Sequence, residues 1–318
     1  MTYSRIVFAS LCLLLPQLAL ASDKKAKDDN PMIANSIGMK LVLIRKGEFQ
    51  MGSEELPSEL PIHKVRLTKD FYFGAHPVTV GQFKAFVKDT GYKTDAEMAG
   101  KSAVGIDAET RWYSSKNKTT WRNPGFEQAD DHPVVCVNWH DADAFCKWLS
   151  KKESKKYRLP TEAEFEYAAR AGTTTRFSYG EADESLKGNA NLADESLLTK
   201  MDKKIALQGA PKGNKSGGIA KWDDGYPFTS PVSKFKANPW GLFDMHGNVW
   251  TWCKDWSVNR YQPGAVDDPA GPEAGKGRVI RGGSWSMGPL RCRSANRVQR
   301  DPAESFCYVG IRIARDVE

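Results

Sequence analysis

The sequence predicts a single loop-rich domain of the α+β class, and three observations lead to that prediction. Apolar residues recur at helical spacing in three segments, and the short apolar runs elsewhere are interrupted by glycine and proline. The chain has 27 Gly and 17 Pro, typical of long loops, while 10 Trp, 14 Phe and 10 Tyr supply a sizeable core. No Pro/Gly/Ser-rich linker separates two periodic regions, so we expect one domain.

Three helices are expected. The first is marked by amphipathic spacing of Val80, Phe83, Phe86 and Val87. The second follows Asn138 as N-cap, and its core-facing residues are Trp139, Ala142, Phe145, Cys146 and Leu149. The third begins behind Pro160 with a capping box of Thr161 and Glu164, and Gly172 ends it. Strands are expected over residues 41–44, 65–67 and 310–314.

The N-terminus reads as a secretory signal over residues 1–21. Arg5 precedes an apolar run, and Ala19-Leu20-Ala21 gives the small-x-small cleavage pattern. Residues 22–34 follow as a flexible leader, and the folded domain is expected from 35 to 318. The apolar run is too short to span a bilayer, so we expect a periplasmic or secreted protein without a membrane span.

The charge of the chain argues against a nucleic-acid binder. The formal net charge is +7, but basic and acidic residues are interspersed along the sequence. A nucleic-acid binder normally carries its basic residues in a clustered stripe. We therefore expect protein or small-molecule partners and no nucleic acid.

Two segments near the C-terminus resemble signatures of a known family. They are Gly247-Asn248-Val249-Trp250-Thr251-Trp252 and Arg281-Gly282-Gly283-Ser284-Trp285. Further matches run from Asn35 to Asp316 and include Gly47–Ser53, His132–Val135, Tyr157–Ala168 and Val309–Arg312. Together they resemble the formylglycine-generating enzyme family, also called sulfatase-modifying factors. The resemblance implies a compact domain with little regular structure, distantly similar to C-type lectins. The stretch at about 193–222 departs from the usual family length and is polar and Lys/Gly-rich from Lys200 to Gly218, so we expect an exposed insertion there.

The resemblance places a candidate catalytic pocket around Trp250 and Ser284. Enzymes of the family hold Cu(I) between two cysteines a few residues beyond Gly-Gly-Ser, and two soft thiolates suit that metal. Here Met287 stands at the first cysteine position, and Cys292 matches the second by its distance from Ser284. If the sequence is aligned with the family on residues 294–297 instead, the loop after Ser284 becomes shorter and Cys292 no longer matches that position. Either way the pair is incomplete, so copper is an unfavoured cofactor.

The cysteine pairing is left open by the sequence. After the signal segment the chain has an odd number of cysteines, so at least one is free or pairs between molecules. Cys253 and Cys292 follow the two signatures and could meet in space. The full set is Cys136, Cys146, Cys253, Cys292 and Cys307.

The resemblance also implies structural Ca²⁺, which prefers oxygen ligands. A first site would use the side chains of Asn191 and Asp224 with the carbonyls of Leu192 and Tyr226. A second would use the carbonyls of Gly247 and Val249 with Asp244 and Thr251, where the family usually has Asn and Glu. The alternative is that Asp224 and Asp244 are turn residues bonded to nearby backbone amides.

Three functions remain from the sequence. The first is a binding or regulatory protein without formylglycine chemistry. Family precedent is TagR, a periplasmic accessory protein of type VI secretion that promotes activation of a membrane kinase, so the partner could be a kinase sensor domain. The second is an oxidoreductase of altered chemistry, similar to the periplasmic family member that matures the pyoverdine chromophore. The third is copper-dependent formylglycine formation on sulfatases.

Overall fold

The computed structural model describes residues 30–201 and 218–317, apart from residues 99, 108, 110–112 and 117. The expected signal segment and residues 22–29 of the leader lie outside the described residues. The leader was expected to extend to residue 34, but the structure differs there. Met32–Ala34 form strand β1, which pairs antiparallel with β2, and the Pro31 carbonyl accepts a hydrogen bond from Leu43 N–H at 2.8 Å.

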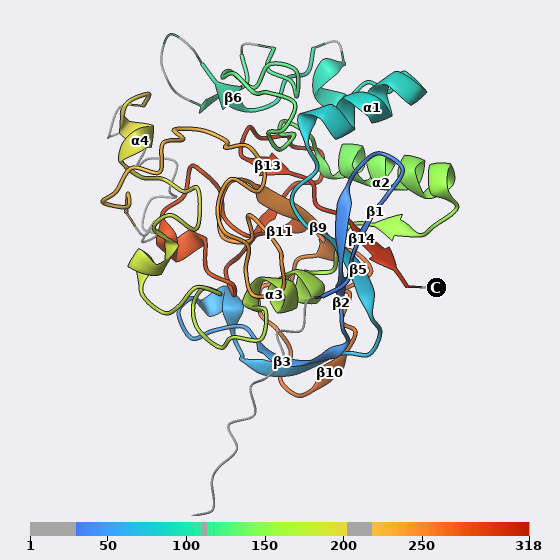
Figure 1. The fold of residues 1–318 in the computed structure, drawn as a ribbon, viewed down its shortest axis with the longest axis vertical. Helices are drawn as coiled ribbons and strands as arrows, with labels where there is room; N and C mark the ends of the chain where they lie inside the picture. Colours follow the sequence, from blue (N-terminus) through green and yellow to red (C-terminus); the bar gives the residue numbers. More distant parts are fainter. Residues whose placement is uncertain are drawn as a thin grey trace, which may run out of the picture.

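The main sheet joins the first and last strands of the described residues. Its order is β1-β2-β5-β14-β8, with antiparallel pairing throughout. The last strand lies between elements from the first and second quarters of the sequence, which makes the molecule one domain of mixed α+β class (Figure 1). The strands are β2 (Lys40–Ile44), β5 (Phe71–Gly74), β8 (Tyr157–Arg158) and β14 (Ala314–Asp316).

Two smaller sheets and a hairpin make up the rest of the β structure in the described residues. The four-stranded sheet has the order β12-β11-β9-β13 and carries both signature segments, while β10-β4-β3 forms a three-stranded sheet at the lower edge of Figure 1. The strands are β3 (Gly47–Met51), β4 (His63–Leu67), β6 (Gly105–Ile106), β7 (Tyr113–Ser114), β9 (Trp250–Trp256), β10 (Val266–Asp267), β11 (Arg278–Arg281), β12 (Arg297–Arg300) and β13 (Val309–Gly310). The expected strand over 310–314 is divided between β13 and β14.

The three expected helices are confirmed, the second and third with their expected N-caps. They are α1 (Val80–Thr90), α2 (Trp139–Glu153) and α3 (Glu162–Arg170). Thr79, Asn138 and Thr161 each close a capping box, which satisfies backbone amides that the helix itself leaves unpaired. The left-handed residue Ala171 ends α3, one position before the expected Gly172.

Helix α3 lies at the centre of the molecule and positions the signature strands. It contacts β3, β9 and β11, and every one of its residues is buried (Figure 1). Helices α1 and α2 pack against each other on the upper right of the same view, above the main sheet. Among the described residues no helix is long and apolar enough to cross a bilayer.

The segment expected to be an exposed insertion, 193–222, is buried at both of its described ends. Ala193, Leu197 and Met201 join the largest apolar cluster, and Trp222 joins a smaller one. A short helix, α4 (Glu195–Leu198), lies within it. The segment is polar on average, and that average does not show that a few apolar residues in its flanks pack into the core. Residues 202–217 lie outside the described part.

Within the part of the chain that the structure describes, four short 3-10 segments connect the regular elements. They span Pro57–Glu59, Asp95–Glu97, Asp183–Leu186 and Pro289–Arg291.

Candidate functional site

The turn after β11 sets the position of Ser284. Gly282 and Gly283 adopt φ angles of +100° and +75°, which side chains other than glycine rarely adopt. A Cβ atom on Gly283 would lie 2.5 Å from Cys292 Sγ, so the close approach of the two segments requires glycine. Ser284 is fully buried, and its Oγ lies 3.0 Å from Ser286 Oγ.

Aromatic rings surround this turn. The indole of Trp285 lies at the centre, and its Nε1 donates to the Cys307 carbonyl at 3.2 Å. The Ser286 hydroxyl bonds to the Tyr113 phenol, and burial raises the pKa of that phenol well above its usual value. The rings that pack around Trp285 or Tyr113 are Phe126, Phe228 and Tyr308. Ser284, Ser286 and Tyr113 therefore form a chain of hydroxyl groups, buried at the two serines and in a partly buried residue at Tyr113, that the sequence pattern did not identify.

Trp250 contributes packing to this region. It begins β9, is 2% exposed and belongs to the largest apolar cluster, together with Trp285.

The structure brings Met287 and Cys292 together, but their chemistry does not fit a copper centre. Cys292 Sγ lies 3.8 Å from the Met287 carbonyl oxygen, and both side chains pack in an apolar cluster with Phe177 and Leu192. Burial raises the pKa of the Cys292 thiol to about 12, which favours the neutral thiol over the thiolate that binds metal. The second sulfur is a neutral thioether, so the donor set lacks the anionic pair that suits Cu(I) in this family.

The thiols remain unpaired across the described residues. All five cysteines after the signal segment are free and buried. Cys253 and Cys292, which the sequence suggested could meet, pack in separate apolar clusters. Cys136, Cys146 and Cys307 belong to the largest cluster, where they act as small apolar residues.

Three residues of the first candidate calcium site are joined in the structure, through backbone N–H groups and not through the carbonyls expected as ligands, as the turn-residue alternative expects for Asp224. Asp224 Oδ1 accepts from Tyr226 N–H at 2.8 Å, and Oδ2 accepts from Leu192 N–H at 3.2 Å. Asn191 donates its side-chain amide to the Phe228 carbonyl, which leaves its buried Oδ1 without a partner among the described residues. Burial and then the neighbouring Asp194 raise the pKa of the Asp224 carboxyl to about 7.

These features fit a hard cation. A buried amide oxygen without a donor and two adjacent carboxylates are both unfavourable unless a proton or a cation offsets them. Asp194 was not among the expected ligands; it caps α4, and its Oδ2 accepts from Asp224 N–H at 2.5 Å. The described residues hold no group of three or more His, Cys, Asp or Glu side chains that could bind a metal, so such a site would depend on amide and carbonyl oxygens.

The second candidate site is less favourable for a cation. Asp244 Oδ1 is buried without a partner within the described chain, and Oδ2 accepts from Ser233 N–H at 3.2 Å. The guanidinium of Arg312, which donates to the Phe243 carbonyl, already acts electrostatically on this carboxyl and opposes the rise in its pKa that burial causes.

The remaining expected ligands of the second site lie in tightly packed backbone. Gly247 has φ +136°, and a Cβ on it would lie 2.1 Å from the Asn191 carbonyl oxygen, so the two candidate sites adjoin there. Val249 and Thr251 are buried, Val249 in the core cluster and Thr251 within β9.

A buried ion cluster fixes α3 to the signature strand β11. The Arg281 guanidinium is fully buried and donates to Glu162 at 3.0 Å and Glu166 at 2.8 Å. Arg297 makes a second pair with Glu162 through its Nε and Nη2 atoms, and Tyr261 donates to the same carboxylate. Breaking such a pair leaves an uncompensated buried charge, so these residues hold the turn at Ser284 in place.

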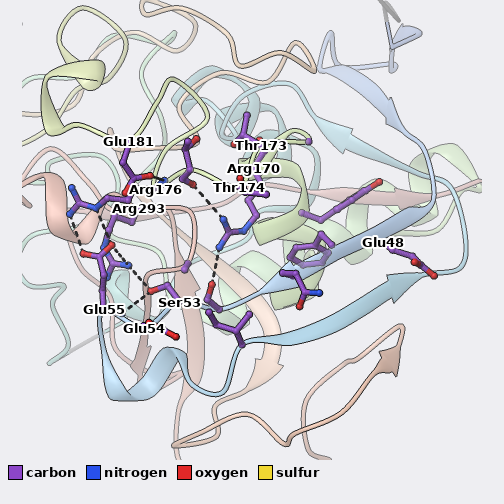
Figure 2. Close-up of a pocket in the computed structure, with 18 of the residues that line it drawn as sticks. Glu48, Ser53, Glu54, Glu55, Arg170, Thr173, Thr174, Arg176, Glu181 and Arg293 are labelled. Carbon is purple, nitrogen blue, oxygen red and sulfur yellow. Dashed lines mark hydrogen bonds and ion pairs between the residues drawn. The ribbon is translucent and has the colours of Figure 1, made fainter. Parts of the chain in front are cut away.

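The structure also has a pocket of about 500 Å³ between β3 and the end of α3, on which sequence reasoning placed no site. Figure 2 shows charged residues gathered at one end of it, with Arg176, Glu55 and Arg293 linked to one another, and Glu48 apart from them. Glu55 pairs with Arg176 at 2.9 Å and with Arg293 at 3.3 Å. The residues that line the pocket come from segments that are far apart in sequence, which is why no local motif reveals the pocket.

Comparison with known proteins identifies the fold. The family described as "Sulfatase-modifying factor enzyme 1-like domain" matches residues 30–317. A formylglycine-generating enzyme of Streptomyces coelicolor is 37% identical over 300 residues, which cover 86% of this chain and 88% of that protein.

Two further similarities bear on function. A serine/threonine-protein kinase pkn1 of Chlamydia pneumoniae is 32% identical over 283 residues, covering 87% of this chain and 38% of the kinase. The solved structure of PvdO from Pseudomonas aeruginosa superposes with a TM-score of 0.70 at 29% identity, covering 92% of this chain and all of PvdO.

Proposed function

The chain belongs to the sulfatase-modifying factor enzyme 1-like family, and from that premise we propose that it is an exported accessory protein that binds a partner and does not make formylglycine. The observation that carries the proposal is the sulfur pair beside Ser284. A neutral thioether at Met287 and a buried, high-pKa thiol at Cys292 replace the two thiolates that the enzymes use.

The proposed partner is the sensor domain of a membrane kinase. Relatives named as serine/threonine-protein kinases contain a region about 30% identical to this chain over some 38% of their length. In those proteins the same fold is part of a chain that bears a kinase name, which supports a kinase-associated role. The signal-like segment 1–21 favours an encounter on the outer side of the inner membrane.

We further propose that calcium stabilises the fold at the first candidate site. The unpartnered Asn191 Oδ1 and the Asp224 carboxylate, beside Leu192 and Tyr226, would hold the ion. A calcium ion there supplies positive charge that ties the flank of 193–222 to the loop around Asp224, and Asp194 orients that loop through its backbone amide. The same ion is expected less strongly at Asp244, because Arg312 already supplies a positive charge.

Two measurements on the exported protein test the accessory role. A cysteine-containing sulfatase peptide is incubated with the protein, Cu(I), oxygen and reductant, and its mass is followed; no conversion is expected. A pull-down from periplasmic extract is then expected to capture a membrane kinase through its exported domain. Conversion of the peptide, or capture of sulfatases in place of a kinase, would overturn the proposal.

An oxidoreductase of altered chemistry is the second candidate. The likeness to PvdO and the hydroxyl chain from Ser284 to Tyr113 favour it. Metal analysis of the purified protein separates the two candidates: calcium alone supports the accessory role, whereas bound copper or iron would favour oxidation chemistry.

A further inference from the structure

The pocket between β3 and the end of α3 is suited to a ligand by its shape. Its volume of about 500 Å³ lies in the range of small-molecule and side-chain sites. One wall is a row of aromatic rings: Phe49 and Tyr167 have centroids 5.3 Å apart, and Tyr167 and Trp240 have centroids 4.8 Å apart. Ile62, which is 44% exposed, lies at the same pocket. The wall therefore offers apolar area and π faces to an occupant.

The arginines of the pocket are already paired with carboxylates. Arg170 donates to Glu166 at 2.8 Å, a buried carboxylate that it shares with Arg281. Arg293 is buried and donates to both oxygens of Glu59, the nearer at 2.7 Å. These two guanidinium groups have the geometry of permanent structural pairs, which are not free to bind an anion.

The third arginine is matched as well, and acidic groups remain. Arg176 binds Glu55 through two nitrogens and Asp183 at 2.7 Å. The exposed side chains of Glu54 and Glu181 also line the pocket, and Figure 2 shows both at its charged end. Glu181 accepts only a backbone N–H, from Arg176 at 3.1 Å, among the bonds of the described residues. Four glutamates and three arginines line the pocket, so its lining is acidic by one formal charge beside the aromatic wall.

We propose that this pocket binds a basic side chain, lysine or arginine, of the partner protein. The apolar stem of such a side chain packs against Trp240 and Tyr167, and its cationic end meets Glu54 and Glu181. Aromatic faces attract cations through their quadrupole, and the rim carboxylates add charge complementarity. The inference rests on the proposed function, because it assigns the surface through which the accessory protein recognises its partner.

The direct test uses the full-length exported protein and two peptides, acetyl-Lys-Phe-Lys-amide and acetyl-Glu-Phe-Glu-amide. Isothermal titration at low ionic strength is expected to show binding of the lysine peptide, weakened by salt, and none of the glutamate peptide. The double variant Glu54→Gln/Glu181→Gln is expected to lower the affinity at least about tenfold. Trp240→Leu is expected to do the same, while Glu273→Gln, an exposed carboxylate outside the pocket, leaves it unchanged.

Melting temperatures of the variants show that each is folded, and because Glu54 and Glu181 are exposed the double variant tests the charge without disturbing the core. Equal binding of the two peptides, or unchanged affinity in the double variant, would overturn the inference. A double variant that still captures the same kinase as the wild type would also overturn it while leaving the proposed function intact. Conversion of a sulfatase peptide by the wild type refutes the proposed function and does not depend on this pocket.

Discussion

The absence of formylglycine chemistry can be tested by restoring the missing thiolate at residue 287. Copper binding by Cys292 requires the thiolate, and burial raises the pKa of its thiol from 9.0 to about 12. Three pKa units correspond to about 4 kcal/mol, or roughly a thousandfold penalty on binding compared with an unperturbed thiol. The thioether of Met287 carries no charge to offset this penalty. We therefore expect weak Cu(I) binding and no turnover in the wild type.

The assay combines Cu(I) competition against a colorimetric chelator with mass spectrometry of a sulfatase peptide. Met287→Cys is expected to bind Cu(I) more tightly than the wild type, because a second thiolate enters beside Cys292, whose Sγ already lies 3.8 Å from the carbonyl of residue 287. Met287→Ser, which adds no sulfur ligand, is the matched control and is expected to bind no better than the wild type. Wild-type turnover that disappears in Cys292→Ala would refute the reasoning and make the enzyme hypothesis the leading one.

Three further predictions follow from the structure. Calcium should raise the melting temperature, because at a hundredfold excess over its dissociation constant it adds roughly 3 kcal/mol to the free energy of unfolding. Asp224→Ala should remove most of this gain, whereas Asp223→Asn, at an exposed neighbouring residue, should keep it. An unchanged melting temperature on adding chelator would count against calcium. Burial and then Glu162 raise the pKa of the Asp255 carboxyl to about 7, so the folded state holds a proton that the unfolded state releases near pH 4. The free energy of unfolding should therefore fall between pH 4 and pH 7, by up to about 4 kcal/mol, and Asp255→Asn should flatten this loss in urea titrations; an identical pH profile for the variant would contradict it. Mass spectrometry of the exported form should give Ser22 as the first residue, and an intact Met1 there would contradict the signal assignment.

The helices and their caps could be predicted from sequence because the information is local. Thr161 and Glu164 satisfy backbone amides three residues apart, and Asn138 and Asp141 do the same at α2, so tertiary packing was not needed to place either helix. The family could be identified for a related reason. The signature glycines, among them Gly283, lie where the backbone has a positive φ or approaches another segment closely. Only glycine suits such positions, so the motif has glycine at set spacings that can be recognised in the sequence.

The position of the candidate sites was only partly accessible. The family resemblance placed Asn191, Leu192, Asp224 and Tyr226 in one group, and the structure joins Leu192, Asp224 and Tyr226 by hydrogen bonds. It could not show that Asp194 lies against Asp224, because that contact arises from the folding of the 193–222 flanks into the core. The expectation of an exposed insertion there came from the average polarity of the segment. An average does not reveal that a few apolar side chains pack into the core.

The sequence by itself determined the family, the α+β class, the capped helices and the replacement of a thiolate by Met287, all of which are written in local residue types. Only the tertiary structure decided the ionisation of Cys292, the ring of aromatic residues around Trp285 and the acidic pocket beside Trp240. Burial and the juxtaposition of distant segments set these properties. A pKa depends on the solvent and charges around a group, and a pocket depends on the segments that enclose it.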